Sequence, residues 1–303
     1  MSKITKALEK AARERLQRRK EHVTVTAAAV TVPVERVEHE QIASVGRIQI
    51  DPHIVTATDP KSPIAEQYRI LKTNLLSLRL GQGSRVLLVT SAVHGEGKSV
   101  TSINLALTLA RQEQLRVVLV DGDMRKRSIN RWLGISERTH GLSTVLSHGG
   151  ELNGSLLRLQ TPPLTILPAG PAPEHPAELL ESQSMKRLVA TLRSQFDVVL
   201  IDAPPVIPVS DPGIMASLAN GVLFVVRAGR TQRKTVAQAQ NMLQRVKANI
   251  LGCVLTHVED YLPGYYRYYH YYRYGAQSQK SSTQPTTVAL TEDGTATAAV
   301  EGS

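Results

Sequence analysis

Apolar residues along the chain gather in short runs that alternate with segments of helical periodicity. Helical spacing of Ile64, Tyr68, Leu71 and Leu75 predicts a helix over residues 62–80, and VTSINLALTLARQ predicts another over 100–112. Buried strands are predicted at RVLLVTS (85–91), RVVLVDGD (116–123), LTILPAG (164–170), FDVVLIDAPP (196–205), GVLFVVRAG (221–229) and ILGCVLTHV (250–258). This alternation predicts an α/β fold, in which a parallel sheet is covered by helices on both faces.

The pattern changes at both ends of the chain. The first 22 residues place Lys and Arg around a thin apolar stripe, which predicts a basic helix that is either solvated or docks on a partner or an anionic surface. The expected organisation is a basic amphipathic helix over 1–22, a linker over 23–60, a folded domain over 61–260, a tyrosine cluster over 261–275 and a disordered tail over 276–303.

Composition narrows the class of protein. The net charge of +10 indicates anionic partners such as phosphates, membrane surfaces, nucleic acid or acidic proteins. The single cysteine, Cys253, excludes an intrachain disulfide, fits a reducing cytosol and is expected to be a small buried side chain. No stretch approaches the about 18–20 apolar residues that span a bilayer, so the protein is expected to be soluble and cytoplasmic.

A glycine-containing loop lies between the first predicted strand and the next helix, in the sequence SAVHGEGKSV. Glycines let backbone N–H groups turn toward phosphate oxygens, and a helix N-terminus adds partial positive charge. The alternative is a tight turn before a helix; the first position of the phosphate-loop consensus is Ala92 rather than glycine. The expected nucleotide contacts are Gly95, Glu96, Gly97, Lys98, Ser99 and Val100.

Carboxylates follow two of the predicted strands. Asp121 and Asp123 end the second strand and Asp202 ends the fourth, which is the pattern of a strand that places a carboxylate near a bound magnesium ion. The carboxyl ends of parallel strands meet at one edge of a sheet, so these acids are expected near Lys98. The predicted metal ligands are Ser99, Asp121, Asp123 and Asp202. The predicted catalytic residues are Lys98, Asp121 and Asp123; either aspartate could accept a proton.

Eight of the nine tyrosines lie in the segment YLPGYYRYYHYYRY, after the last predicted strand. A phosphate-transfer site needs an acceptor, and repeated phenol groups with arginines and flanking glycines are expected to be accessible. The alternatives are a stacking platform for single-stranded nucleic acid and an interface segment. The predicted phosphoacceptors are Tyr261, Tyr265, Tyr266, Tyr268, Tyr269, Tyr271, Tyr272 and Tyr274.

Together, four segments resemble the bacterial tyrosine autokinases (BY-kinases) of the capsule and exopolysaccharide chain-length family. SAVHGEGKSV is similar to the Walker A motif of that family, VVLVDGDMRK to its Walker A′, VVLIDAPPV to its Walker B and YYRYYHYYRY to its C-terminal tyrosine cluster. The resemblance covers roughly residues 60–275. It implies a P-loop NTPase fold of the ParA/MinD-like subclass and an ATP- and Mg²⁺-dependent autokinase that phosphorylates its tyrosine cluster in trans.

The resemblance also implies partners and a cellular role. It implies a homo-oligomeric ring, a separate membrane-embedded chain-length adaptor that recruits the kinase to the inner face of the membrane, a phosphotyrosine phosphatase, no nucleic acid and a role in exopolysaccharide or capsule polymerisation and export. The family's ring-contact motif is matched by Glu66, Arg69 and Lys72, with lysine in place of the usual last arginine. Val100 replaces the usual threonine, and THVED replaces the family pattern after the last strand, so no adenine contact is assigned.

Two other functions use the same features. The first three motifs also resemble the ParA/MinD ATPases, which would make the chain an ATPase switch without protein phosphorylation. That class carries a second lysine early in its loop, whereas residues 91–94 here are Ser, Ala, Val and His. A non-enzymatic binding module would use the basic helix and the aromatic segment but would have no use for three aspartates at strand ends.

Overall fold

The computed structural model of the chain describes residues 43–44, 49–78, 80, 83–136, 140–148, 151–160 and 163–258. All of them belong to one compact unit, Val37–Ser303. The predicted basic helix over 1–22, the tyrosine cluster over 261–275 and the tail over 276–303 lie outside the described residues.

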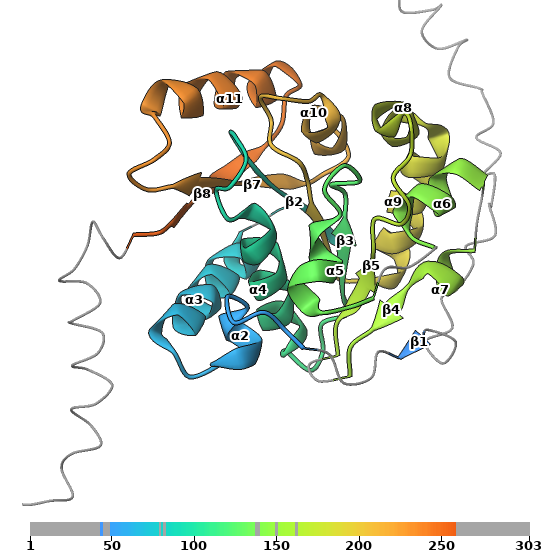
Figure 1. Cartoon of the computed structure of the whole chain (residues 1–303), viewed down its shortest axis with the longest axis horizontal. Coiled ribbons are helices and arrows are strands. Elements are labelled where there is room, and N and C mark those ends of the chain that lie inside the picture. Colours follow the sequence, from blue (N-terminus) through green and yellow to red (C-terminus); the bar gives the residue numbers. More distant parts are fainter. Residues whose placement is uncertain are drawn as a thin grey trace, which may run out of the picture. The chain divides into compact units, whose positions relative to one another are not determined.

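The centre of the unit is an eight-stranded sheet in the order β1-β4-β5-β3-β6-β2-β7-β8 (Figure 1). Every pairing is parallel except that of β4 with β5. The strands are β1 (Ala43–Ser44), β2 (Arg85–Ser91), β3 (Val117–Asp121), β4 (Leu157–Arg158), β5 (Thr165–Leu167), β6 (Val198–Asp202), β7 (Gly221–Arg227) and β8 (Ile250–Thr256). All six predicted strands are confirmed. The two that the sequence did not indicate, β1 and β4, have two residues each and are too short for a periodic signal.

Helices cover both faces of the sheet, which confirms the predicted fold class. The helices are α2 (Val55–Thr58), α3 (Pro63–Ser77), α4 (Lys98–Ala110), α5 (Ser128–Leu133), α6 (Leu142–His148), α7 (Leu152–Ser155), α8 (Pro176–Glu181), α9 (Gln183–Gln195), α10 (Asp211–Ala216) and α11 (Arg233–Arg245). Figure 1 shows α2, α3 and α4 grouped together. Helix α3 is capped by Ser62, whose hydroxyl accepts a hydrogen bond from the Ala65 N–H (3.2 Å), and Pro63 is its first residue.

The central strands are apolar on both faces because alternate residues enter different cores. In β2, Val86 and Leu88 pack with side chains of α6 and of α8 to α11, whereas Leu87 and Val89 pack with those of α3, α4 and α5. A strand buried on both faces shows a continuous apolar run rather than an alternating one. This explains why the predicted strands stand out in the sequence.

The folded domain begins earlier than the predicted boundary at residue 61. Ile54 is fully buried, and Asn104 of α4 accepts hydrogen bonds from both the backbone N–H and the hydroxyl of Thr56 (2.9 Å each). The Asp51 N–H donates to the Trp132 carbonyl (3.0 Å). The end of the predicted linker is therefore part of the domain, and its single helical turn is too short to show periodicity.

The last strand is less buried than its apolar sequence predicts. In the part of the chain that the structure describes, β8 pairs only with β7, at the edge of the sheet. Cys253 is exposed, so the expectation of a buried cysteine is wrong, and Leu255 is 59% exposed. An apolar run does not distinguish an edge strand from a central one, because the difference lies in neighbours that are distant in sequence.

Replacing Ile54 by alanine should lower the free energy of unfolding by about 2–5 kcal/mol, because it leaves a cavity between α2 and α4. The matched control is Ile64→Ala on α3, where the side chain is 42% exposed and the expected change is about 0.5 kcal/mol or less. Equilibrium unfolding in urea measures both. Equal effects would show that residues 49–60 are not an integral part of the domain.

Candidate functional site

The site lies where the carboxyl ends of three adjacent strands meet. The strand order places β6 between β3 and β2, and the register pairs Asp121 directly with Asp202 and Asp202 with Val89. The loop after β2 therefore begins beside Asp202, and Asp121 lies one strand further away. Open parallel sheets bind ligands at this edge, as the sequence predicted.

The loop from β2 to α4 has the backbone of a phosphate cradle. Gly95 (φ +80°) and Gly97 (φ +88°) adopt left-handed conformations that a side chain disfavours. Gly97 is the N-cap of the 13-residue helix α4, and no side chain caps this end. The N–H groups of the first turn are therefore available to an anion, and the helix dipole favours one there.

Contacts from outside the loop hold it in place. The buried Glu96 carboxylate accepts hydrogen bonds from the Val93 N–H (2.8 Å) within the loop and from the Thr231 hydroxyl (2.5 Å). The Thr256 hydroxyl, at the end of β8, donates to the Glu96 carbonyl (2.8 Å). The Thr256 methyl group lies close to Gly97, and a Cβ added to Gly97 would be 3.3 Å from that methyl carbon. The sequence predicted Glu96 as a nucleotide contact; in the structure its side chain braces the loop. The contribution of Thr256 was not predicted.

Lys98 is the centre of a buried charge cluster. Its Nζ lies 2.9 Å from Oδ2 of Asp123 and 3.6 Å from Oδ2 of Asp202, and it donates to the Ser99 hydroxyl (3.2 Å). Burial by itself would lower the pKa of Lys98, but the charges of Asp202 and Asp123 outweigh it and raise that pKa. The ammonium is therefore fully charged at neutral pH.

The pKa values of the buried carboxyl groups are shifted in the opposite direction to those of exposed acids. Burial, reinforced by the charge of Asp202, raises the pKa of Asp121 to about 8, although the Ile129 N–H hydrogen bond opposes the shift. Burial also raises the pKa of Asp202, against the effects of the Lys98 ammonium and the Ser99 hydroxyl. Carboxyl groups this close cannot all ionise easily unless positive charge is supplied.

The residues present fit a magnesium ion that binds together with nucleotide phosphates. Oδ1 of Asp202 accepts from the Ser102 hydroxyl (3.0 Å), but the buried Oδ2 has no hydrogen-bond partner of ordinary length among the described residues. The Ser99 hydroxyl lies in the same cluster. Among the described residues, no three or more His, Cys, Asp or Glu side chains form a metal-binding group, and Mg²⁺ bound through phosphates and waters needs no such group.

Two further contacts connect the loop after β3 to its surroundings. Arg125 makes a two-pronged ion pair with the buried Asp211 (2.9 and 3.1 Å). This ties the loop to α10, where Asp211 is the first helical residue. The Ser128 hydroxyl donates to that of Ser99 (2.9 Å). Neither contact could be predicted from a sequence motif, because each joins residues whose spacing along the chain is not fixed.

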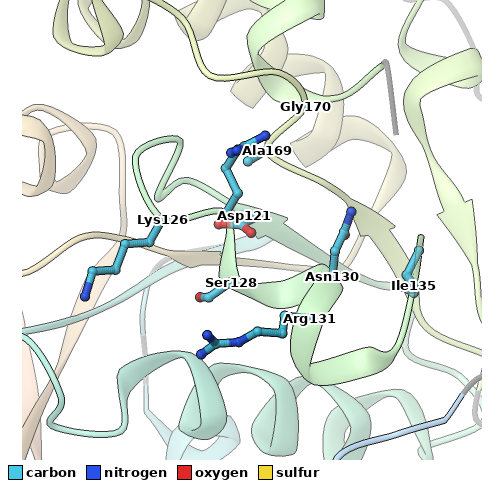
Figure 2. A pocket seen from close by; sticks show the side chains of 9 residues that line it. Asp121, Lys126, Ser128, Asn130, Arg131, Ile135, Ala169 and Gly170 are labelled. Carbon is cyan, nitrogen blue, oxygen red and sulfur yellow. The ribbon is translucent and has the colours of Figure 1, made fainter. Parts of the chain in front are cut away.

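A pocket of about 620 Å³ opens beside Asp121, on the side of β3 away from β2 (Figure 2). Figure 2 shows the Asp121 carboxylate with Ser128, Asn130 and Arg131 around it. The lining residues are Asp121, Lys126, Arg127, Ser128, Asn130, Arg131, Ile135, Ala169 and Gly170. The pocket thus continues from the charge cluster, and the acid shared by both is Asp121.

The other predicted site residues lie apart from this cluster. On α3, the Arg69 guanidinium contacts the Glu66 carboxylate and the Pro60 carbonyl within the chain, and Lys72 is half-buried on the same helix. Val100 is half-buried in the first turn of α4. The eight predicted phosphoacceptor tyrosines lie outside the described residues.

Fold and site together define a nucleotide-binding protein of the P-loop class. In agreement, the family model described as "AAA domain" matches residues 84–252. The chain is 34% identical over 203 residues to the tyrosine-protein kinase YwqD of Bacillus subtilis, covering 67% of this chain and 85% of YwqD. It therefore belongs to the family of bacterial tyrosine-protein kinases.

A solved structure agrees with this assignment, and the chain is also similar to part of a longer relative. The kinase domain of the Escherichia coli tyrosine kinase ETK superimposes with a TM-score of 0.65 at 27% identity, covering 70% of this chain and 82% of that domain. The succinoglycan biosynthesis transport protein ExoP of Rhizobium meliloti is 34% identical over 203 residues, which is 66% of this chain and 26% of ExoP.

The raised pKa of Asp121 predicts a pH-dependent stability in protein free of nucleotide and metal. The folded protein holds this proton more tightly than the unfolded chain does, so the stabilisation is lost as pH rises from about 4 to about 8. The melting temperature should therefore fall over this range, and it should fall less in Asp121→Asn. Differential scanning calorimetry at several pH values measures this; equal slopes for both proteins would contradict the prediction.

Removing the Thr256 hydroxyl should loosen the phosphate loop. Thr256→Val keeps the shape but loses the hydrogen bond to the Glu96 carbonyl, so Mg²⁺–ATP should bind with a Kd about fivefold higher, which corresponds to about 1 kcal/mol. Thr256→Ser keeps the hydroxyl and is the control. Isothermal titration calorimetry compares the three proteins, and a Val variant that binds as tightly as the Ser variant would exclude the brace.

Proposed function

We propose that the chain is an ATP- and Mg²⁺-dependent protein-tyrosine autokinase that phosphorylates its C-terminal tyrosine cluster in trans. The observation that carries the proposal is the contact of Lys98 with Asp123 and Asp202 next to the phosphate loop. Eight of the chain's nine tyrosines occupy one segment after the last strand, and YwqD and ETK are named tyrosine kinases.

Each side chain of the cluster has a definite task in this proposal. The backbone of residues 95–99 binds the ATP phosphates, and Lys98 stabilises negative charge on the transferred phosphoryl group. Ser99 and Asp202 hold Mg²⁺ together with Asp121 and Asp123, directly or through water. The ion supplies positive charge that neutralises the phosphates and aligns them.

The proton acceptor is assigned from the geometry of the two remaining aspartates. The Asp123 carboxylate forms an ion pair with the Lys98 ammonium (2.9 Å), whereas the Asp121 carboxyl group accepts hydrogen bonds from the backbone N–H groups of Asp123 (3.2 Å) and Ile129 (3.1 Å). Asp121 lines the pocket, so its carboxyl group borders open space next to the phosphate loop. We therefore assign Asp121 as the group that takes the tyrosine proton, with Asp123 positioning Lys98.

The biological role is inferred from a named relative. ExoP is named a succinoglycan biosynthesis transport protein, which supports a role in exopolysaccharide or capsule polymerisation and export. Among the described residues, no helix is both long and apolar enough to cross a membrane. We propose that a membrane-embedded chain-length adaptor recruits this kinase to the inner face of the cell membrane. We also propose that the kinase acts as a homo-oligomeric ring, with α3 in the contacts, and that a phosphotyrosine phosphatase reverses the reaction.

A ParA/MinD-like ATPase switch would use the same loop, but the absence of lysine from residues 91–94 disfavours it. The two functions differ in their products. The switch would only hydrolyse ATP, whereas the kinase leaves phosphate on tyrosine.

The test is to incubate the purified full chain with Mg²⁺–ATP, with and without the cytosolic part of the adaptor, and to map phosphate by mass spectrometry. Phosphate should appear between Tyr261 and Tyr274 and be lost by at least about 100-fold in Lys98→Met, because a transition-state charge contact is removed. Lys186→Met, an exposed lysine on α9, is the control. Hydrolysis of ATP without formation of phosphotyrosine would contradict the kinase proposal and favour the ATPase switch.

A further inference from the structure

The lining of the pocket beside Asp121 is rich in positive charge. Lys126, Arg127 and Arg131 line it, and all three side chains are exposed. Within the described residues none of them forms an ion pair, unlike Arg116 and Arg125, which have acidic partners. Three cations against the single acid Asp121 give the lining an excess of positive charge, which indicates that its ligand is an anion.

The cations are placed by the fold rather than scattered over a surface. The Arg131 guanidinium stacks over the Trp132 ring, 5.3 Å from its centroid. Arg127 adopts a left-handed backbone (φ +49°), which is uncommon for a residue with a side chain. Figure 2 shows the Arg131 guanidinium on the same side of α5 as Ser128, whose hydroxyl bonds to that of Ser99 in the phosphate loop. The basic lining is therefore directly connected to the nucleotide site.

Charge excludes the unmodified acceptor segment as the preferred occupant. Even with Asp121 ionised, the lining has three positive charges and one negative charge. Residues 261–275 contain Arg267 and Arg273 but no acid, so the unmodified segment is itself positive. Like charges repel, whereas each phosphate on tyrosine adds about −1.5 to −2 charges and offers oxygens that pair with arginine.

We propose that this pocket is a phosphotyrosine-binding subsite, which takes a phosphorylated residue of the segment 261–274 and holds that segment beside the phosphate-transfer site. The inference rests on the proposed kinase function and makes its substrate more specific. The preferred substrate is then a tyrosine segment that already carries phosphate. The volume of about 620 Å³ lies in the range of about 300–1,000 Å³ that is usual for ligand sites.

The subsite has a consequence for the order of phosphorylation. A segment with one phosphate binds more tightly than one without, so its neighbouring tyrosines are phosphorylated before a new segment enters. Chains should therefore pass quickly from one phosphate to several. Without the subsite, phosphates would be distributed over the chains at random.

Binding of a labelled peptide tests the subsite directly. The receptor is the full chain with its eight clustered tyrosines replaced by phenylalanine, saturated with Mg²⁺ and a non-hydrolysable ATP analogue. The probes are peptides of residues 261–276, unphosphorylated or with phosphate on Tyr268 alone, and their binding is followed by fluorescence anisotropy. The phosphorylated peptide should bind at least about tenfold tighter, which corresponds to about 1.4 kcal/mol.

Variants show whether the pocket is responsible for this preference. Arg131→Gln and Lys126→Gln should each reduce the preference severalfold, and the double variant should bring it to within about twofold. Lys186→Gln on α9 removes the same charge at a distance and should leave the preference unchanged. A preference that survives the double variant, or that all three single variants lower equally, would overturn the proposal.

Further outcomes distinguish the subsite from the nucleotide loop and from the kinase function. If the phosphorylated peptide binds the nucleotide-free receptor and is displaced when the nucleotide analogue is added, the phosphate occupies the nucleotide loop and the subsite does not exist. In the intact chain with Mg²⁺–ATP, the double variant should accumulate singly phosphorylated molecules, as intact mass spectrometry would show. Absence of any phosphotyrosine would refute the kinase function, whereas phosphorylation with equal affinity for both peptides would refute only the subsite.

Discussion

The structure depends on the contact of one buried ammonium, that of Lys98, with the carboxylates of Asp123 and Asp202. Three aspartates lie together at the sheet edge with almost no exposure, and burial of unpaired carboxylates is costly. Lys98 compensates part of this charge, but burial, reinforced by the charge of Asp202, still raises the pKa of Asp121. The site is therefore electrostatically prepared for added positive charge, which a magnesium ion would supply.

The topology of the sheet produces this arrangement. Because β6 lies between β3 and β2, the acidic strand ends and the phosphate loop become neighbours although they are far apart in sequence. The same edge continues on one side to β8, where Thr256 braces the loop, and on the other to the basic pocket beyond Asp121. The tyrosine segment begins a few residues after Thr256, so the loop brace and the acceptor segment share one stretch of chain.

The local sequence pattern was sufficient to predict the features that depend on residues close together in the chain. The apolar runs identified the six longer strands, and the glycines and strand-end aspartates identified the residues that the fold brings together. Contacts between distant segments were not predictable. Examples are the packing of Ile54, the Arg125–Asp211 ion pair and the exposure of Cys253, each of which is decided by which element becomes its neighbour. The basic residues of the pocket were likewise not predictable, because a run of Lys and Arg exposed to solvent shows the same sequence pattern.

The central claim is that this sheet-edge site transfers phosphate to the tyrosine segment of another copy. The most direct measurement mixes a Lys98→Met chain that keeps its tyrosines with an otherwise intact chain whose eight clustered tyrosines are phenylalanine. After addition of Mg²⁺–ATP, mass spectrometry locates phosphate on each chain. The account predicts phosphotyrosine on the Lys98→Met chain in the mixture and in neither protein alone. A mixture without phosphotyrosine, although the second chain binds Mg²⁺–ATP, would contradict it.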